Sequence, residues 1–363
     1  MSDMKILIVA NSSIGLVKFR GELIQKLQEN HDVYIATKFD KCIQELREIS
    51  DNLIEIDMER RGTNLISEPQ LYCKYVKVIK SLSPDFIITY TIKPNIYCGL
   101  ISGRRSIPYV SNITGLGTAF QKEGMLKQYI IKLYKKALKR AKVVFFENDA
   151  NKKVFVDYGI IKAENGHVLC GAGVNIQKFV LTEYPAGKSI NFLFMGRLMK
   201  EKGVNELIEA VEKLRRVRDN FVLTVLGEYE ENYHKKIKQL EEEGVVRYIG
   251  WAEDVKPYIA ECMCTVLPSY HEGMSNTLLE CAAMGRPIIT SDIAGCRESL
   301  VDGKSGYLVN VRDSKDLFEK MNQFCELSYE ERKAMGLESR KHIEKLFDKD
   351  KVVKETIKRM ELG

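Results

Sequence analysis

The sequence predicts an α/β protein of two successive domains, each with a parallel β-sheet that helices cover on both faces. Short apolar segments typical of buried strands alternate with helical segments along almost the whole chain, which is the pattern of βαβ units. The length of 363 residues exceeds one ordinary core and fits two domains. The polar stretch TEYPAGKS, which follows soon after Phe179, interrupts the alternation and marks the expected boundary.

In the first domain, expected over residues 1–180, KILIVA at Lys5–Ala10 forms the first strand and a helix runs from about Lys18 to Gln28. The helical segments that follow include YCKYVKVIKSL. The later strands are expected at DVYIAT, NLIEI, DFIITY, PYVSNI and KVVFF.

The alternation restarts at Ile190 in the second domain, expected over residues 181–347. Its strands are expected at FLFMG, FVLTVLG, VRYIG, CTVLP, PIITS and GYLV. Its helices are expected at Asn205–Arg215, Tyr233–Glu242, Asp254–Glu261 and Asn276–Met284, near Arg297, and at the end of the chain. A cleft between the two domains is the default ligand site for such an architecture.

The composition argues against several classes of protein. A hydrophobic share of 45% and a charged share of 29% are typical of a soluble globular protein. No stretch approaches the roughly 18 apolar residues that span a bilayer, and the first apolar run is too short for a secretory signal. Nine cysteines, mostly in apolar runs, indicate reduced thiols in the cytoplasm. Cys262 with Cys264, and the triplet Asp348-Lys349-Asp350, lack further ligands, so no metal site is expected.

Residues 124–142, GMLKQYIIKLYKKALKRAK, combine apolar residues at near-helical spacing with interleaved lysines and arginine. Two interpretations stay open for this basic amphipathic helix. It can lie on an anionic membrane surface, or it can be an ordinary sheet-covering helix with a solvated lysine face. Nucleic acid is not expected as a partner, because no recognition motif accompanies the charge.

The segment Pro268–Glu280, PSYHEGMSNTLLE, indicates a ligand site. Glu272 stands in a turn and Glu280 follows eight positions later, with Gly, Ser, Asn and Thr between them at an expected helix start. The loop follows a buried strand, and open α/β sheets bind ligands at that edge. Because unpaired N–H groups at a helix start suit phosphate oxygens, the segment predicts a phosphorylated, hydroxyl-rich ligand.

Each domain has a further loop suited to phosphate. After the strand FLFMG come Gly196 and Arg197 and then Lys202, whose two cations could clamp a diphosphate. In the first domain, Ala10–Gly15 follows the first strand and leads to Lys18. This small-residue loop has neither the three-glycine dinucleotide spacing nor the Gly-Lys-Ser/Thr ending of a P-loop, so a simple strand turn remains the alternative.

Five segments of the chain together resemble the retaining glycosyltransferases of family 4. They are GRLMKEKG, VLGEYEE, YIGWAEDV, VLCGAGVNIQKF and LPSYHEGMSNTLLECAAMGRPIITSDIAGCRESLVDGKSGYLV. The resemblance spans almost the whole chain. It implies the GT-B fold, in which two Rossmann-like, doubly wound domains face a central cleft, with a C-terminal helix, here 348–363, that crosses back to the first domain. In the first domain, YTIKPN and NITGLGTAF resemble the bacterial subgroup that builds O-antigen, capsule or glycoprotein glycans on polyprenyl diphosphate.

The resemblance also implies roles for residues on the donor side. Arg197 and Lys202 would hold the donor diphosphate and stabilise the leaving nucleoside diphosphate, the job that a metal does in other transferases. Glu272 would contact hydroxyls of the donor hexose, and Glu280 would accept hydrogen bonds from the ribose. The other donor-side residues would be Gly15, Gly196, Ile249, Trp251, Gly273, Met274, Ser275, Asn276 and Thr277.

On the acceptor side this chain departs from the family pattern, because it has no histidine after PYVSNI. Thr114 stands there, and Lys93 is the substitute that the sequence offers, with Ser13 and Lys18 as further contacts. The resemblance implies a metal-independent hexosyl transfer that needs no cofactor and forms an α linkage, with the leaving phosphate assisting deprotonation of the acceptor.

The donor sugar stays open in this reading. A UDP-linked hexose or N-acetylhexosamine is favoured, and GDP-mannose remains possible. The acceptor would be a polyprenyl-diphosphate-linked glycan at the inner face of the cell membrane. A GT-B nucleotide-sugar epimerase and a non-enzymatic nucleotide-sugar-binding protein are the alternatives.

Overall fold

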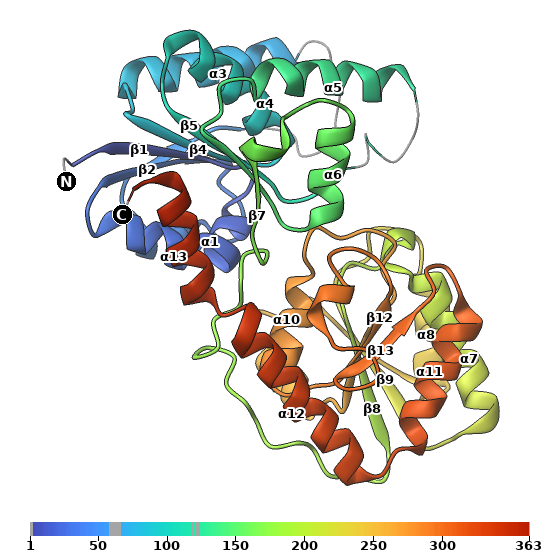
Figure 1. Cartoon of the computed structure of the whole chain (residues 1–363). Coiled ribbons are helices and arrows are strands. Elements are labelled where there is room, and N and C mark those ends of the chain that lie inside the picture. The colour runs from blue at the N-terminus through green and yellow to red at the C-terminus, as the bar shows by residue number, and fades with distance from the viewer. Residues whose placement is uncertain (1–2, 58–66, 118–119, 121–123, 363) are drawn as a thin grey trace. The chain divides into compact units, whose positions relative to one another are not determined.

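The computed structural model describes residues 3–57, 67–117, 120 and 124–362, which form two compact units (Figure 1). One unit comprises Met1–Ala172 together with Asp350–Gly363, and the other comprises Gly173–Lys349. The first boundary therefore lies earlier than the expected 180/181. The physical reason is that Val174 and Phe179 are buried in the core of the second unit.

The first unit contains a seven-stranded parallel sheet in the order β3-β2-β1-β4-β5-β6-β7. Its strands are β1 (Lys5–Val9), β2 (Asp32–Thr37), β3 (Leu53–Glu55), β4 (Phe86–Tyr90), β5 (Tyr109–Ile113), β6 (Val143–Phe146) and β7 (Gly166–Val168). Because successive strand residues point to opposite faces, Ile6 and Ile8 enter one core and Leu7 and Val9 the other.

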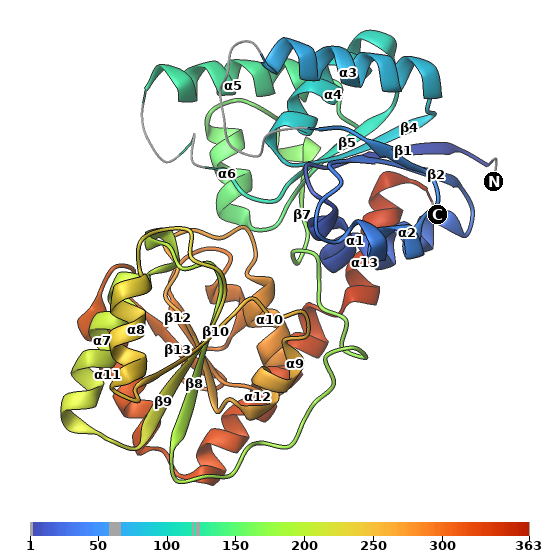
Figure 2. The same cartoon turned by 180° about the vertical axis from the view of Figure 1, so that it is seen from behind.

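Helices cover both faces of this sheet, as Figures 1 and 2 show from opposite sides. The face of Ile6 is covered by α1 (Ser13–Gln28), α2 (Ile43–Ile49) and the C-terminal α13 (Lys349–Met360). The face of Leu7 is covered by α3 (Ser67–Leu82), α4 (Ile92–Arg105), α5 (Met125–Ala137) and α6 (Asp149–Asp157). Since Val353 and Met360 of α13 are buried in the same core as Ile6 and Ile8 of β1, the end of the chain completes the core of the first unit.

The second unit contains a six-stranded parallel sheet in the order β10-β9-β8-β11-β12-β13. Its strands are β8 (Ile190–Met195), β9 (Phe221–Leu226), β10 (Val246–Gly250), β11 (Cys264–Leu267), β12 (Ile288–Ser291) and β13 (Gly306–Val309). Its helices are α7 (Val204–Val217), α8 (His234–Glu242), α9 (Lys256–Glu261), α10 (Asn276–Ala283), α11 (Ser314–Glu326) and α12 (Tyr329–Leu346).

The expected strands and helices are present, with corrections at particular elements. The first helix begins at Ser13 instead of Lys18, because Ser12 has the extended backbone of an N-cap residue, with φ −160° and ψ 136°. Lys93, expected after the strand DFIITY, lies in the first turn of α4. The short α2 and the edge strand β7 were also missed, since segments this short have too few residues to show a period.

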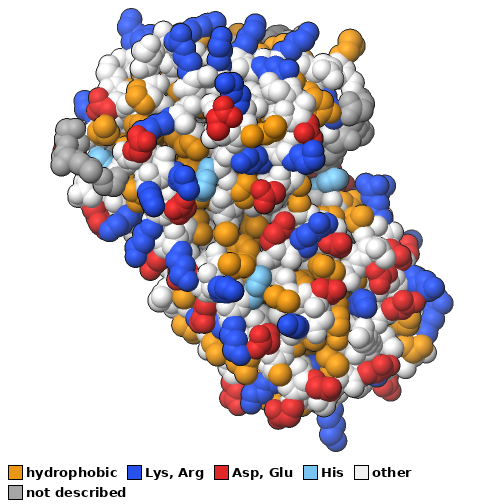
Figure 3. Space-filling view, in the orientation of Figure 1, with side chains coloured by type: hydrophobic (Ala, Val, Ile, Leu, Met, Phe, Trp, Pro, Cys, Tyr) orange, Lys and Arg blue, Asp and Glu red, His pale blue; other side chains and the backbone are white. Residues whose placement is uncertain are grey.

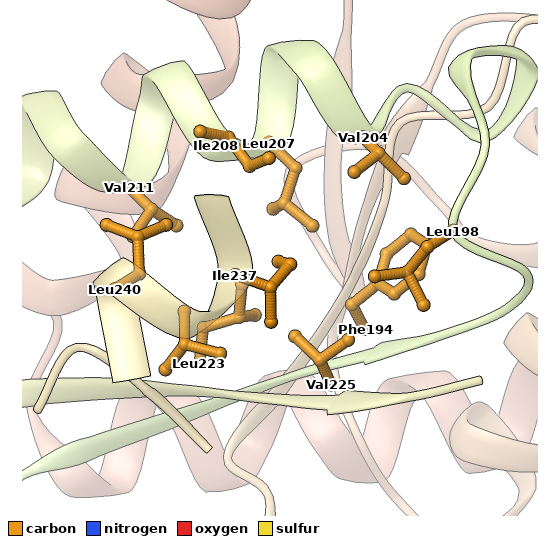
Figure 4. Close-up of a pocket in the computed structure, with 11 residues that line it drawn as sticks. Phe194, Leu198, Val204, Leu207, Ile208, Val211, Leu223, Val225, Ile237 and Leu240 are labelled. Carbon is orange, nitrogen blue, oxygen red and sulfur yellow. The ribbon is translucent and has the colours of Figure 1, made fainter. Parts of the chain in front are cut away.

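The core of the second unit is densely filled. Between its sheet and the helices α7 and α8 lies an apolar gap of only about 10 Å³, lined by side chains such as Phe194, Leu207 and Ile237 (Figure 4). A space this small and without polar groups is a packing defect of ordinary size and not a ligand site. The interior between the sheet and these two helices therefore has no room for a ligand, and the ends of the strands are the candidate site.

Arg286, which follows α10, is a fully buried arginine whose hydrogen bonds are satisfied by backbone and hydroxyl oxygens. Its guanidinium donates to the carbonyls of Ile259 and Ala260 at 2.8 and 2.9 Å and to Thr182 Oγ1 at 2.6 Å. Burial lowers the pKa of Arg286, but the surrounding oxygens compensate for lost water. Within the second unit, this side chain therefore joins the segment before β8 to α9.

We expect Arg286→Met to lower the free energy of unfolding by about 3 kcal/mol, because several buried oxygens would lose their donor. Urea unfolding followed by circular dichroism measures this change. The control is Arg247→Met, which removes a half-exposed arginine paired with Glu261 at 2.9 Å and should cost less than about 0.5 kcal/mol. Equal destabilisation by the two variants would contradict this account of Arg286.

Candidate active site

The candidate site of the second unit lies where the strand order reverses. From β8 the chain proceeds to β9 and β10 on one side of the sheet, and it returns to place β11, β12 and β13 on the other. The loops that follow β8 and β11 therefore leave the sheet side by side and in opposite directions. Open α/β sheets bind ligands at this switch point.

Two charged side chains from these adjacent loops meet there. Lys202 Nζ, in the loop after β8, donates to Glu272 Oε1, in the loop after β11, at 2.5 Å. The hydroxyl of Ser269 donates to the same carboxylate oxygen at 2.9 Å. Both charged side chains keep part of their surface exposed, at 20% for Lys202 and 13% for Glu272. A ligand at the strand ends can thus reach a cation and a carboxylate that lie in direct contact.

Glycines let the backbones around this pair come close together. At Gly203, where φ is 71°, an added Cβ would lie 2.0 Å from the carbonyl oxygen of Pro268. At Gly295, where φ is 87°, it would lie 2.4 Å from the carbonyl oxygen of Gly273, and Ser275 N donates to Gly295 O at 2.8 Å. The turn that carries Glu272 is therefore held between two backbone segments, one from each side.

Arg197, the second expected cation of this loop, is paired with a different carboxylate. Its guanidinium forms an ion pair with Glu230, which follows β9. The guanidinium carries five N–H donors, so this pairing leaves donors for a phosphate. The sequence does not indicate Glu230 as the partner of Arg197, since VLGEYEE contains several acidic residues and no pattern distinguishes one of them.

The other donor-side residues expected in the second unit follow the strands of its sheet or lie at the start of α10. Gly196 directly follows β8. Gly273 and the buried Met274 continue the Glu272 turn, Ser275 is the N-cap of α10, Asn276 and Thr277 form its first turn, and Glu280 follows one turn later. Ile249 is the residue before the last of β10, two strands from β8, and Trp251, which directly follows β10, is half exposed.

A stack of aromatic rings lies between β9 and β10 that the sequence analysis did not identify. The rings of Tyr229 and His234 stack with centroids 3.6 Å apart, and the ring of Tyr248 lies 4.8 Å from that of Tyr229. Burial raises the pKa of Tyr229 to about 12, and the neighbouring Tyr248 adds to this increase. Tyr248 also donates to Gly227 O at 3.1 Å, so the stack fixes the loop after β9.

In the first unit, the expected loop after β1 is the start of a helix. Ser12 stands at the N-cap position of α1 but makes no capping hydrogen bond with its side chain, and the hydroxyls of Ser12 and the fully buried Ser13 both donate to the carboxylate of Asp40. Gly15 follows in the first turn of α1, with open space where a Cβ would be, and Lys18 lies one turn further along. Asp40 was missed, because the contact joins loops that are distant in the sequence.

The other expected acceptor-side residues lie on neighbouring strands of the same sheet. Lys93, after β4, forms an ion pair with Glu68 of α3 at 2.8 Å. Thr114 directly follows β5. The order β1-β4-β5 places these residues beside the Ser13 loop at one sheet edge, as parallel strands require. Lys93 Nζ is therefore held by a carboxylate of α3, and its role as the substitute for a histidine stays a prediction.

Within residues 3–57, 67–117, 120 and 124–362, no group of three or more His, Cys, Asp or Glu side chains has the arrangement of a metal site. In the same residues, no helix combines the length and the apolar character that crossing a bilayer requires.

Comparison with known proteins identifies the class of this site. The family description "Glycosyl transferases group 1" matches residues 182–342, which include the Lys202–Glu272 pair, and "Glycosyl transferase 4-like" matches residues 5–148. The chain belongs to the glycosyltransferases of the GT-B fold.

Relatives along the full length are also glycosyltransferases. The N,N'-diacetylbacillosaminyl-diphospho-undecaprenol alpha-1,3-N-acetylgalactosaminyltransferase of Campylobacter jejuni is 28% identical over 89% of this chain and 90% of its own. The capsular polysaccharide biosynthesis glycosyltransferase CapM of Staphylococcus aureus is 23% identical over 96% and 94%. Anabaena HepE, solved in complex with UDP and glucose, shares the fold, with a TM-score of 0.82 at 17% identity over 99% of both chains.

We expect Gly295→Ala to lower the rate of this glycosyltransferase by at least tenfold, because the new Cβ would collide with the carbonyl of Gly273 and displace the Glu272 turn. The measurement is the rate of sugar transfer from the donor that the wild-type enzyme uses. The matched control is Gly303→Ala, where φ is 73° but nothing lies within 4 Å of the added Cβ. Its cost should be about 1 kcal/mol of stability, with no loss of rate. Equal rates for the two variants would show that the collision does not matter.

Proposed function

We propose that this glycosyltransferase moves a hexose or N-acetylhexosamine from a UDP-linked sugar to a lipid-diphosphate-linked glycan in the biosynthesis of a cell-surface polysaccharide or glycan, with retention and an α linkage. The observation that carries the proposal is the Lys202–Glu272 pair at the switch point of the second sheet. A nucleotide sugar presents hydroxyls and a phosphate on either side of one C1–O bond. A carboxylate and an ammonium group in contact are suited to those two partners.

In this proposal, Glu272 accepts hydrogen bonds from hydroxyls of the donor sugar and holds its reacting carbon in place. Lys202 and Arg197 bind the diphosphate and stabilise the charge that grows on it as the C1–O bond breaks. The N–H groups at the start of α10 add to this stabilisation, and Glu280 accepts from the ribose. These cations supply the positive charge for the leaving group, so the reaction needs neither a metal nor another cofactor.

Retention of configuration follows in the proposal from attack on the face that the diphosphate leaves. The acceptor hydroxyl loses its proton to a phosphate oxygen of the leaving group, so no enzymatic nucleophile is required. A UDP donor is supported by the UDP complex of HepE, and the lipid-diphosphate acceptor by the name of the Campylobacter relative. GDP-mannose remains the alternative donor.

The test is release of nucleoside diphosphate from UDP-N-acetylgalactosamine, UDP-N-acetylglucosamine, UDP-galactose and GDP-mannose, each with and without an undecaprenyl-diphosphate-linked acceptor. Thermal shift selects the donor first, since a ligand at 100 times its Kd stabilises by about 2.7 kcal/mol. We expect release from one UDP-sugar, unchanged by EDTA. No release from any donor would refute the transferase proposal, and a free 2-epimer as product would favour the epimerase.

We expect Glu272→Ala to lower the rate of transfer by 10²- to 10³-fold, because the sugar loses the carboxylate that orients it. The matched control is Glu212→Ala, which removes another ion-paired glutamate of the second unit, the partner of Lys236, and should leave the rate unchanged. Circular dichroism checks that both variants are folded. An unchanged turnover in Glu272→Ala would remove this residue from the mechanism.

We also propose that the basic helix over residues 124–142 docks on an anionic membrane, at the cytoplasmic face where lipid-linked acceptors are glycosylated. In the structure Met125 and Tyr129 at the start of α5 are 92% and 60% exposed, while Ile131, Tyr134 and Ala137 face the core. Lys127 is buried over the ring of Tyr158 and is not part of this surface.

The basic part of the surface extends beyond α5. Figure 3 shows Lys and Arg side chains gathered over α3, α4 and α5. The exposed ones are Lys74, Lys77, Lys80, Arg104, Arg105, Lys132, Lys135, Lys136, Lys139 and Arg140. Within the part of the chain that the structure describes, Lys132, Lys135, Lys136 and Lys139 form no ion pair with a carboxylate. Exposed apolar side chains beside such cations fit an anionic lipid surface.

We expect the combined change of Lys132, Lys135, Lys136 and Lys139 to Gln to lower binding to vesicles that contain phosphatidylglycerol by at least tenfold, since each lysine near an anionic surface contributes about 1 kcal/mol. Cosedimentation with vesicles measures this loss. The control changes Lys235, Lys238, Lys304 and Lys315, which are exposed lysines of the second unit, to Gln. Equal binding of the two variants would refute docking through α5.

A further inference from the structure

We propose that Tyr270, held by Glu206 and Arg312, is a positioning residue that fixes the orientation of the Glu272 turn during sugar transfer. The inference rests on the proposed role of Glu272 as the carboxylate that holds the donor sugar. Tyr270 itself has no contact with the ligand in this account. It acts through the backbone of the turn, two residues before Glu272.

The hydroxyl of Tyr270 is hydrogen-bonded to the carboxylate of Glu206. Its side chain is only 5% exposed, and its hydroxyl lies 2.7 Å from both carboxylate oxygens of Glu206. Burial raises the pKa of Tyr270, and the hydrogen bond to Glu206 raises it further, so the hydroxyl stays protonated and donates. A donor between two carboxylate oxygens makes a charge-assisted bond, which is stronger than a neutral one.

This bond links the two loops that carry the site. Glu206 lies in the first turn of α7, one turn after Lys202, and Tyr270 N donates to Glu201 O at 2.9 Å. The Lys202–Glu272 ion pair joins the same two loops on the side of the strand ends. An ion pair alone would allow the turn to pivot about it. The second attachment, through Tyr270 and Glu206, removes that freedom.

A third element holds the ring of Tyr270. The guanidinium of Arg312, in the loop between β13 and α11, lies 4.6 Å from the ring centroid, within the range of a cation–π contact. Arg312 has a left-handed backbone with φ 61°, a conformation that residues other than glycine adopt at a cost. The contact with Tyr270 adds a third loop of the sheet edge to the attachments of the turn.

The test compares Tyr270→Phe with Tyr184→Phe. Tyr184 is a close match in the same unit, because it is also 5% exposed, donates its hydroxyl at 2.7 Å, to Met263 O, and has a guanidinium, of Arg286, 5.7 Å from its ring centroid. We expect Tyr270→Phe to lower kcat about tenfold, with the Kd for UDP and the KM for the donor within twofold of wild type. Tyr184→Phe should leave kcat unchanged.

Variants of Glu206 test the other partner of the hydrogen bond and complete a double-mutant cycle. Glu206→Ala should lower kcat by the same factor as Tyr270→Phe. Combining the two changes should add no further loss, because each removes the same hydrogen bond between Tyr270 and Glu206. Glu206→Gln retains a carbonyl oxygen that accepts the hydroxyl, so it should recover part of the rate. A kcat within twofold of wild type in Tyr270→Phe would overturn the proposal, as would the same loss in Tyr184→Phe or independent losses in the double variant.

Hydrogen exchange separates this inference from the proposed function, because it needs no substrate. In the free protein, the backbone amides of residues 271–275 should exchange at least tenfold faster in Tyr270→Phe than in wild type, and at the wild-type rate in Tyr184→Phe. Unchanged exchange in Tyr270→Phe overturns the positioning role, whether or not the wild-type protein transfers sugar. Failure of every donor in the transfer assay refutes the proposed function and leaves this result standing.

Discussion

The contact between the backbone at Gly203 and the carbonyl of Pro268 is the constraint on which the active site depends. It sets the spacing of the loops after β8 and β11, and a side chain at residue 203 would force them apart. The Lys202–Glu272 ion pair joins two flexible side chains, with 20% and 13% of their surface exposed, and adds to this attachment without setting the spacing. Backbone packing therefore places the two charges, and the charges are available for binding a ligand. Backbone packing at Gly295 likewise holds the Glu272 turn, from the other side.

The fold could be predicted from the sequence because its main signal is strong. Segments such as KILIVA and FVLTVLG are apolar throughout, as strands buried on both faces must be, and the helices between them have an apolar stripe. The errors lie where that signal is weak. The start of α1 depends on Ser12, whose hydroxyl is bonded to Asp40 and which gives no local capping pattern. The unit boundary depends on where Val174 and Phe179 pack, which is a tertiary property.

The residues of the candidate site could be predicted more fully than their pairings. Parallel strands bring all their carboxyl ends to one edge, so residues that follow β8 and β11 had to lie near each other. Which acid meets which base is decided by side-chain directions and loop paths that no short motif encodes. Arg197 with Glu230, Lys93 with Glu68 and Tyr270 with Glu206 are pairings of this kind. The α5 surface shows the same limit, since Met125 is exposed and Tyr134 buried although both lie in one apolar pattern.

The last helix, α13, has a consequence for how enzymes of this type can be recombined. Its residues Val353 and Met360 are core residues of the first unit, although the chain reaches them only after completing the second. The second unit of a relative would therefore have to be inserted between about Ala172 and Asp350, with two junctions, and could not simply replace everything downstream of the first unit. A single-junction hybrid would bring a foreign helix against α1 and β1. Exchange of the second unit between such enzymes, in the laboratory or in evolution, therefore requires insertion at two junctions instead of fusion at one.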